Sequence, residues 1–527
     1  MIAFPIAYAE THFGPKVIPN ILRKAEPEIV LDVPHRVEPG HPLPVLLLVK
    51  DADRYPVRLL EVRVRARVTG HPPFQRLYDL GGERVDSRWY WKVLPVEIPE
   101  GQTGQASILP EVRARVGQTE RTYAVDNYRK TSHEPFEVQI ARDPLPYSPN
   151  WHAGDIHTHS HLTSDQVEFG VPWEPAVELA RAQGLRWFAV TDHSYDLDDD
   201  PHDPLSNHAG LPKWRQLWEE LDRLRPRLHD FAILPGEELS VGNARRRNVH
   251  LLILGSRRFF PGHGDSAERW FHTRPSCLLP EILEQVEPEA LVAAAHPGAS
   301  APILEWLLLR RGKWTLRDLS HPRLDGLQGL NGAFDASFDR ALALWRELLR
   351  HGLHPALLAG NDAHGNFGRF RQIGLPFLSM REHGQQLFGK VKTLVYLPGP
   401  IAGDGLLQRL KQRQAIITDG PFLEIRAKGS GTEEGLVGEE MAERPKVLYL
   451  HARSSPEFGY LREIRIWVGT VPDGETLGHT VRTNRPSYSL EAEIQLPPLR
   501  GPGYLRATLF TRERGDHFAL TNPIWFP

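Results

Sequence analysis

The sequence predicts an α/β barrel in the middle of the chain, flanked on each side by a β-rich, sandwich-like domain. Between residues 149 and 418, short apolar runs alternate with amphipathic helical patterns, as is typical of parallel strands joined by helices. Residues 1–148 and 419–527 have no convincing helical period and carry strand patterns separated by Gly- and Pro-rich turns. The length of 527 residues suits about three domains of this kind.

The N-terminal domain contains three predicted strands, at residues 45–49, 60–68 and 136–140. The last two alternate between apolar and polar residues, so one face packs and the other meets water. Arg63, Arg65 and Arg67 fall on the polar side of the second strand, which we interpret as a solvated face rather than a ligand-binding stripe. The Pro-rich run 144–149 is the predicted linker to the central domain.

The central segment repeats one form, an apolar run that ends in His, Asp or Glu. The first metal-binding motif, His157-Thr158-His159, would place both imidazoles on the same face of a strand. Barrel enzymes place their chemistry at the carboxyl ends of parallel strands, and imidazoles and carboxylates are the donors that bind zinc, manganese or iron. The later runs end in Asp192-His193, Glu237-Glu238, His296-Pro297 and Asp362-Ala363-His364, and a further strand carries His250.

Nine side chains make up the predicted metal site. Six imidazoles and three carboxylates exceed what one ion can hold, so we expect two to three divalent transition-metal ions, Mn, Fe or Zn. The nine are His157, His159, Asp165, His193, Glu238, His250, His296, Asp362 and His364.

These motifs, in this order, resemble the PHP (polymerase and histidinol phosphatase) family of metal-dependent phosphoesterases, over about half of the chain. The resemblance implies a distorted (β/α)7 barrel and, in the CehA/McbA-type branch that the chain looks like, β-rich flanking domains. It also implies three ion sites and a catalytic role for Glu238, Asp192 and His193, with Asp192 orienting its neighbours. The first site would use His157, His159, Glu238 and Asp362, the second Glu238, His250 and His296 with Glu238 bridging, and the third Asp165, His193 and His364.

Two departures from the family pattern leave alternatives open. One extra residue separates His159 from Asp165, so His161 could take the place of Asp165 at the third ion. Glu237 and Glu238 are adjacent, and we assign the ligand role to Glu238 because it fits the family's Pro-Gly-x-Glu spacing. Asn331, at the end of an apolar run, could hydrogen-bond near the site or cap a loop.

The predicted function is hydrolysis of a small-molecule ester, most simply a phosphate ester, by a metal-bridging hydroxide at a di- or trinuclear site. Arg245, Arg369 and Arg371 are candidates for binding the phosphate, although each could equally be an ordinary surface arginine. Hydrolysis of a non-phosphate ester or a carbamate is the enzymatic alternative. A metal-stabilised binding protein without catalysis is the alternative from another class.

Composition restricts the partners and the compartment. A net charge of -3 and no basic run longer than Arg245–Arg247 argue against a nucleic-acid partner. No apolar run of about 18 residues predicts a transmembrane helix. Cys277 is the only cysteine, which excludes an intramolecular disulfide and favours a cytoplasmic location. Residues 1–9 end in an A-x-A pattern, so the remnant of a trimmed secretion signal is the alternative.

Overall fold

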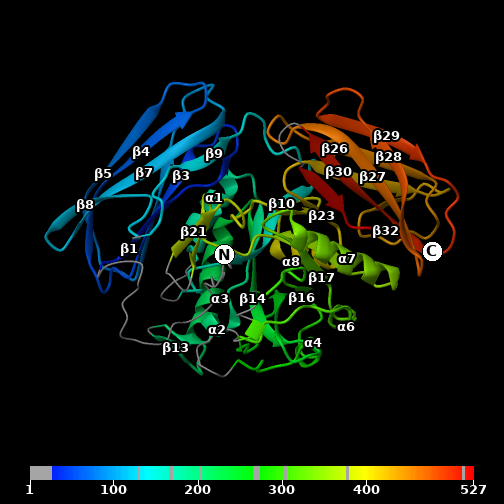
Figure 1. The fold of residues 1–527 in the computed structure, drawn as a ribbon, viewed down its shortest axis with the longest axis horizontal. Coiled ribbons are helices and arrows are strands. Elements are labelled where there is room, and N and C mark those ends of the chain that lie inside the picture. Colours follow the sequence, from blue (N-terminus) through cyan, green and yellow to red (C-terminus); the bar gives the residue numbers. More distant parts are fainter. Residues whose placement is uncertain are drawn as a thin grey trace, which may run out of the picture. The chain divides into compact units, whose positions relative to one another are not determined.

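The computed structural model describes residues 26–527, apart from residues 129, 165–169, 202, 265–272, 302–305, 308, 375–378 and 513–516. Strand accounts for 44 % of the structure and helix for 14 %, so the protein is mostly β (Figure 1). The chain divides into two compact units. Unit 1 contains residues 1–144, 163–184 and 363–388, and unit 2 contains residues 145–162, 185–362 and 389–527.

Unit 1 is built around two sheets. One has the order β1-β3-β6, and the other has the order β2-β9-β7-β4-β5 with β8 beside β7. Side chains from both sheets, among them Leu31, Val45 and Val64, belong to one buried apolar cluster, so the sheets pack face to face. The elements are β1 (Glu28–Asp32), β2 (Arg36–Val37), β3 (Leu43–Lys50), β4 (Val57–Val68), β5 (Phe74–Val85), β6 (Trp89–Val96), β7 (Gly104–Val116), β8 (Thr119–Ala124), β9 (Phe136–Ile140), α1 (Trp173–Ala182), β19 (Ala363–His364), β20 (Phe370–Gly374) and β21 (Ser379–His383).

The three strands predicted in the N-terminal domain are confirmed as β3, β4 and β9. In the second half of β4, valines and an alanine are buried while Arg63, Arg65 and Arg67 are exposed. Arg65 forms an ion pair with Glu111 on the neighbouring strand β7, with N and O 2.7 Å apart. The interpretation of these arginines as a solvated face is therefore confirmed.

Unit 2 contains the largest sheet of the protein. Its strands follow the order β18-β17-β16-β15-β14-β11-β10-β22-β23-β31-β30-β27-β28, and β32 pairs with β30. These strands are β10 (Trp151–His159), β11 (Trp187–Val190), β14 (Ala232–Gly242), β15 (Asn248–Leu254), β16 (Leu291–Ala294), β17 (Gly326–Asn331), β18 (Ala356–Gly360), β22 (Lys392–Tyr396), β23 (Ala415–Thr418), β27 (Tyr460–Thr470), β28 (Gly474–Arg482), β30 (Gly503–Arg512), β31 (Phe518–Thr521) and β32 (Ile524–Phe526).

The prediction of a distorted (β/α)7 barrel is wrong. Parallel pairing is limited to β10–β11, β11–β14, β16–β17 and β17–β18 among the pairings of this sheet that the structure describes. β14 and β15 form an antiparallel hairpin closed by the short turn 243–247, and β15–β16, β10–β22 and β22–β23 are antiparallel too. The physical reason is that five residues leave no room for a crossover helix, so the chain reverses after β14.

The large sheet also continues across residue 418, the predicted start of the C-terminal domain. β23 ends at Thr418 and pairs with β31, which in turn pairs with β30. Beyond β31, the side chain of Asn522 accepts a hydrogen bond from the backbone N–H of Leu357 on β18 and donates one to its carbonyl oxygen, at 2.7 and 3.0 Å. The end of the chain is thus hydrogen-bonded to the strand that leads into Asp362.

Helices and smaller sheets complete unit 2. The amphipathic helical patterns of the central segment predict helices at residues 213–224, 338–351 and 303–311. The first two are confirmed as α3 (Pro212–Leu224) and α7 (Ala336–Arg350), and residues 303–305 and 308 of the third lie outside the described residues. Asp335 caps α7 by accepting a hydrogen bond from the N–H of Ser337. The elements are α2 (Ser194–Leu197), β12 (Asp199–Asp200), β13 (Asp203–Asn207), α3 (Pro212–Leu224), a 3-10 turn (Arg225–Arg227), α4 (Leu279–Leu283), α6 (Leu316–Leu319), α7 (Ala336–Arg350), α8 (Gly403–Lys411), β24 (Phe422–Lys428), β25 (Glu434–Leu436), β26 (Val447–Arg453) and β29 (Ser489–Gln495).

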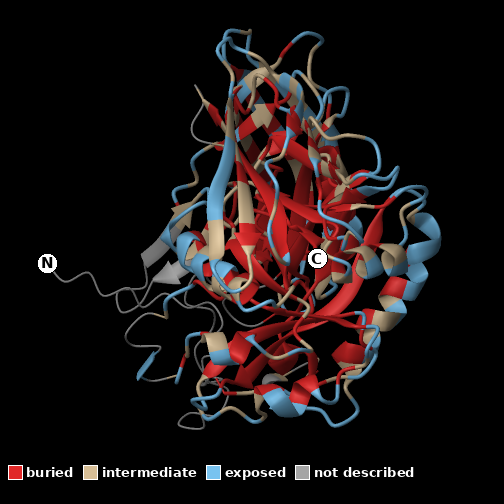
Figure 2. Ribbon diagram, turned by 90° about the vertical axis from the view of Figure 1, so that its right-hand side faces the viewer, coloured by how far each residue is buried: buried red, intermediate tan, exposed pale blue. Residues whose placement is uncertain are grey.

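The strands of unit 2 that carry the predicted ligands are buried over their whole length. β10, β11, β14, β15, β16 and β18 contain only buried residues apart from His152, and Figure 2 shows buried residues concentrated in strands. Ile156, next to His157, belongs to an apolar cluster with Trp187 and Leu234, so the apolar side chains of these strands fix the backbone that carries the ligands. No helix in the described part of the chain is long and apolar enough to cross a membrane.

Candidate metal centre

Seven of the nine predicted donors lie in unit 2, on strands of its large sheet or within three residues after them. Those on strands are buried, as is His193, while His296 and Asp362 are partly exposed. β10 carries His157 and His159, β14 carries Glu238, β15 carries His250, and the chain leaving β11, β16 and β18 carries His193, His296 and Asp362.

The first group of converging donors is His157, His159, Glu238 and Asp362. The Nε2 atoms of His157 and His159 lie 3.2 Å apart, and both face the Oδ1 atom of Asp362, at 3.4 and 3.2 Å. The Oε2 atom of Glu238 lies 3.2 Å from His157 Nε2 and 3.5 Å from His159 Nε2. One cation placed among these atoms would be bound by two imidazoles and two carboxylates.

The second group is Glu238, His250 and His296. His250 presents Nδ1 at 2.6 Å from Glu238 Oε1, and His296 presents Nε2 at 3.1 Å from the same oxygen. The two oxygens of Glu238 therefore face different partners, Oε2 the first group and Oε1 the second. A carboxylate in this position can bridge two ions, because each oxygen binds its own metal.

Glu237, the alternative ligand, points elsewhere. Its carboxyl group accepts hydrogen bonds from the hydroxyl of Ser194 at 3.0 Å and from the backbone N–H of Phe260 at 3.2 Å. Burial raises its pKa well above the usual range. The alternation of side chains on β14 places only Glu238 among the histidines.

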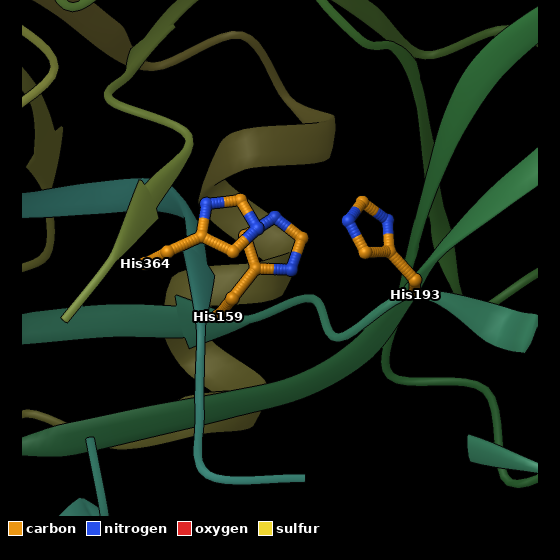
Figure 3. Close-up of side chains that lie close together, drawn as sticks. All are labelled: His159, His193 and His364. Atoms are coloured by element: carbon orange, nitrogen blue, oxygen red, sulfur yellow. The ribbon is translucent and has the colours of Figure 1, made fainter. Parts of the chain in front are cut away.

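The third predicted ion site is only partly within unit 2. The His193 and His159 rings lie with their centroids 4.4 Å apart (Figure 3), and His193 Nδ1 lies 3.0 Å from Glu238 Oε2. His364, the third side chain labelled in Figure 3, is buried and belongs to unit 1. Asp165 lies outside the described residues. The third ion and its donors therefore stay a prediction.

His161, the alternative to Asp165, has another partner in unit 2. Its Nε2 atom lies 3.4 Å from the Oε1 atom of Glu220 on α3, and this contact offsets the effect of burial and lowers the pKa of Glu220.

The electrostatics of the two groups favour a bound cation. Burial disfavours the ionised forms of Glu238 and Asp362. The surrounding histidines outweigh this effect and hold both pKa values well below their usual range. These histidines are His250 and His157 for Glu238, and His157 and His159 for Asp362. Burial lowers the pKa of His157, but Glu238 and Asp362 more than offset this and raise it to about 9. Without metal, a proton on His157 thus supplies the positive charge that the carboxylates require.

Two donors are held by backbone in the left-handed region. His296 has φ of 30° and Asp362 has φ of 53°, values that residues with a Cβ rarely adopt and that cost about 1–3 kcal/mol each. The backbone N–H of Asp362 donates a hydrogen bond of 2.9 Å to the carbonyl oxygen of His157, which fixes its turn against β10. Such strain is concentrated at functional sites, which supports the assignment of both residues as ligands.

Asp192 orients the chain that follows His159. Its Oδ1 and Oδ2 atoms accept hydrogen bonds from the backbone N–H and the hydroxyl of Ser160, both at 2.7 Å, and its carbonyl oxygen accepts the N–H of Glu238 at 3.0 Å. Asp192 therefore links the chain that follows β10 to Glu238 in the middle of β14.

Asp155 was not singled out from the sequence, although it lies two residues before His157. Its buried carboxylate accepts hydrogen bonds from the backbone N–H and the side-chain amide of Asn361, at 3.1 and 2.6 Å, and from the N–H groups of Gly389 and His157. Burial raises its pKa to about 6 despite these donors. Asp155 thus fixes the strand end that carries Asp362, and a polar residue inside a buried strand was the signal that could have identified it.

The predicted phosphate-binding arginines make other contacts. Arg369 donates hydrogen bonds to the carbonyl oxygens of Glu134 and Pro135 within unit 1, at 2.8 and 2.7 Å. Arg371 lies in the same unit, with its Nε atom 3.2 Å from Asp126. Arg245 is exposed in the turn between β14 and β15. Their role in substrate binding stays a prediction.

The chemistry of the donor set fits divalent transition metals. In each group the candidate donor atoms lie within 4.8 Å of one another and come from neutral nitrogen and anionic oxygen, which zinc, manganese and iron share as ligands.

Comparison with known proteins adds no family to this description. No family model matches the chain, and no curated protein matches it. Among solved structures, a β-glucuronidase of Parabacteroides merdae aligns at 11 % identity over 95 % of this chain and 64 % of its own, with a TM-score of 0.17. A glycosyl hydrolase family 2 member of Bacteroides cellulosilyticus aligns at 8 % identity over 96 % and 79 %, with a TM-score of 0.16. This chain spans less than two thirds of the glucuronidase, and these TM-scores are too low to indicate a shared fold, so neither enzyme's activity bears on the chain.

Proposed function

We propose that the protein is a metal-dependent hydrolase that cleaves a small-molecule ester at a site of at least two divalent ions, and that it belongs to the CehA/McbA branch of the PHP family. The observation that carries the proposal is the division of Glu238, whose Oε1 atom faces His250 and His296 while Oε2 faces His157 and His159. Divalent ions bound there supply Lewis acidity, which lowers the pKa of water and stabilises charge on the ester oxygens.

The residues of the chain have separate tasks in this scheme. His157, His159, Glu238 and Asp362 would hold one ion, and Glu238, His250 and His296 the other. Asp192, through Ser160 and Glu238, and Asp155, through Asn361, would fix the backbone that carries the donors. His193 stacks on Tyr195, with ring centroids 4.7 Å apart, and lies beside Glu238, where it can hold or transfer a proton at its imidazole.

A phosphate ester is the preferred substrate class, because the motifs resemble those of the PHP phosphoesterases. Hydrolysis of a carboxylic ester or carbamate is the second, because Arg369 and Arg371 are engaged with carbonyl oxygens and Asp126 in unit 1. Those contacts favour a substrate that does not need a guanidinium clamp for a doubly charged phosphate.

A reconstitution screen tests the proposal. The metal-stripped protein is loaded with manganese, iron(II) or zinc and incubated with panels of phosphomonoesters, phosphodiesters, carboxylic esters and carbamates. We expect hydrolysis within one class, reduced more than about 100-fold by Glu238→Gln because an amide cannot replace a bridging carboxylate. Glu237→Gln is the matched control and should keep turnover, since Glu237 contacts Ser194 and Phe260 instead. Hydrolysis that survives Glu238→Gln would contradict the proposal, and a metal-loaded protein inactive on all four classes would favour a binding role.

A further inference from the structure

Gln328 is a fully buried amide on β17, a strand that carries none of the predicted metal donors. Its Oε1 atom lies 2.8 Å from Nδ1 of His157 and 3.3 Å from the backbone nitrogen of His296. Its Nε2 atom lies 3.1 Å from Oδ1 of Asn331. One side-chain oxygen therefore contacts one donor of each metal group.

The orientation of the amide follows from hydrogen-bond chemistry. A backbone N–H can only donate, so the atom of Gln328 that faces the nitrogen of His296 must be its carbonyl oxygen. That same oxygen faces Nδ1 of His157, and two acceptors cannot share a hydrogen bond, so Nδ1 of His157 must carry a proton. When His157 is neutral, its Nε2 atom therefore has the lone pair that would bind the ion, on the side where Glu238 and Asp362 lie.

The contact with His296 restrains a strained backbone. His296 has φ of 30°, and the hydrogen bond from its N–H to Gln328 helps to hold this conformation, which directs the Nε2 atom toward Glu238. We propose that Gln328 is a positioning residue that couples the two metal groups, fixing the tautomer of His157 in one and the backbone of His296 in the other. The proposal rests on the proposed function only in that it assumes ions at both groups.

A neutral acceptor suits this position. Metal-bound histidines commonly donate their second N–H to a carboxylate, a carbonyl oxygen or water. Here two carboxylates, Glu238 and Asp362, already serve the first group, and a third buried charge beside them would be costly to desolvate. The amide keeps the acceptor without the charge. Asn331 orients it by accepting the Nε2 hydrogen, which is the hydrogen-bonding role left open for Asn331 in the sequence.

The test compares Gln328→Met, which keeps the volume but removes the acceptor, with Gln328→Glu, which restores the acceptor. The measured quantity is the dissociation constant of zinc and of manganese for each site of the metal-stripped protein, by competition with a chromophoric chelator. We expect Gln328→Met to weaken both sites by about 10- to 100-fold and Gln328→Glu to recover most of that loss. In turnover, Gln328→Met should lower kcat with little change in KM.

Gln414→Met is the matched control, since Gln414 is a buried glutamine of the same unit that bonds to Arg409 and Glu439. It should lower the melting temperature and leave both metal affinities unchanged. The coupling role would be overturned if Gln328→Met binds metal with wild-type affinity or is weakened at one site alone. It would also be overturned if a folded Gln328→Glu recovers none of the lost affinity. If Gln328→Met does not fold, Gln328→Asn, whose shorter side chain cannot reach both partners, takes its place with the same expected losses. If both metal affinities depend on Gln328 but the metal-loaded protein hydrolyses none of the esters, the role of Gln328 is supported and the proposed function is refuted.

Discussion

Protons and metal ions should compete for His157, and this competition has a definite pH range. Although burial lowers the pKa of His157, Glu238 and Asp362 raise it to about 9, so the metal-free ring is mostly protonated at pH 7. An ion can bind Nε2 only after that proton leaves. We therefore expect binding of the first ion to release about one proton from His157 at pH 7, and its affinity to fall about tenfold per pH unit from pH 9 to pH 6.

Calorimetric titrations of the metal-stripped protein in buffers of different ionisation enthalpy measure the released protons. The control is His351→Gln, because His351 is exposed and pairs with Glu347 at the end of α7. That change should leave proton release as in the wild type. An apparent binding enthalpy independent of the buffer at pH 7, together with an affinity that does not change between pH 6 and 9, would refute the assignment of His157 as a ligand with a raised pKa.

Substitutions at three further positions test the geometry of the site. In Gly360→Ala the new Cβ would lie 2.9 Å from Cβ of His157, so the free energy of unfolding should fall by about 1–3 kcal/mol and the metal affinity by about tenfold. Gly403→Ala is the control, because its new Cβ would lie 3.5 Å from the nearest atom. Thermal unfolding and metal titration should show neither change in this control. Asp362→Asn and Asp362→Ala should both lose affinity for the ion. In urea unfolding, the alanine variant should be less stable than the asparagine variant by about 1 kcal/mol, because alanine tolerates the φ of 53° less well. Equal stability of the two variants would contradict backbone strain at this position. Asp155→Ala leaves the N–H donors of Asn361 and Gly389 without their acceptor, so the free energy of unfolding should fall by about 3 kcal/mol or more. An unchanged midpoint of urea unfolding would contradict the role of Asp155.

Local patterns predicted individual elements of the fold but not their pairing. Strict alternation identified β4 and β9, and the helical period placed α3 and α7 within two residues of their observed ends. The direction of the strands was wrong because an apolar run reads the same in a parallel and an antiparallel sheet. The five-residue turn between β14 and β15 was the available signal, since so short a connection produces a hairpin.

More of the candidate site than of the fold could be predicted from the sequence. Metal donors are restricted to a few residue types, so His157, Glu238, His250, His296 and Asp362 were visible in the sequence, and the structure brings them together. Gln328 was not visible in the sequence, because a hydrogen-bond partner is defined by its position in space and has no fixed spacing from the ligand. The division of the two oxygens of Glu238 also required the structure.

If Glu238 bridges two ions, the metal content of variants at Glu237 and Glu238 should show it. The wild type, Glu238→Gln and Glu237→Gln are stripped, equilibrated with manganese, iron(II) and zinc in turn, freed of excess metal and analysed by elemental analysis. We expect at least two ions per chain in the wild type and in Glu237→Gln, and loss of both in Glu238→Gln, because each oxygen of Glu238 faces one donor group. One ion or fewer in the wild type, or a Glu238→Gln protein that keeps two, would contradict it.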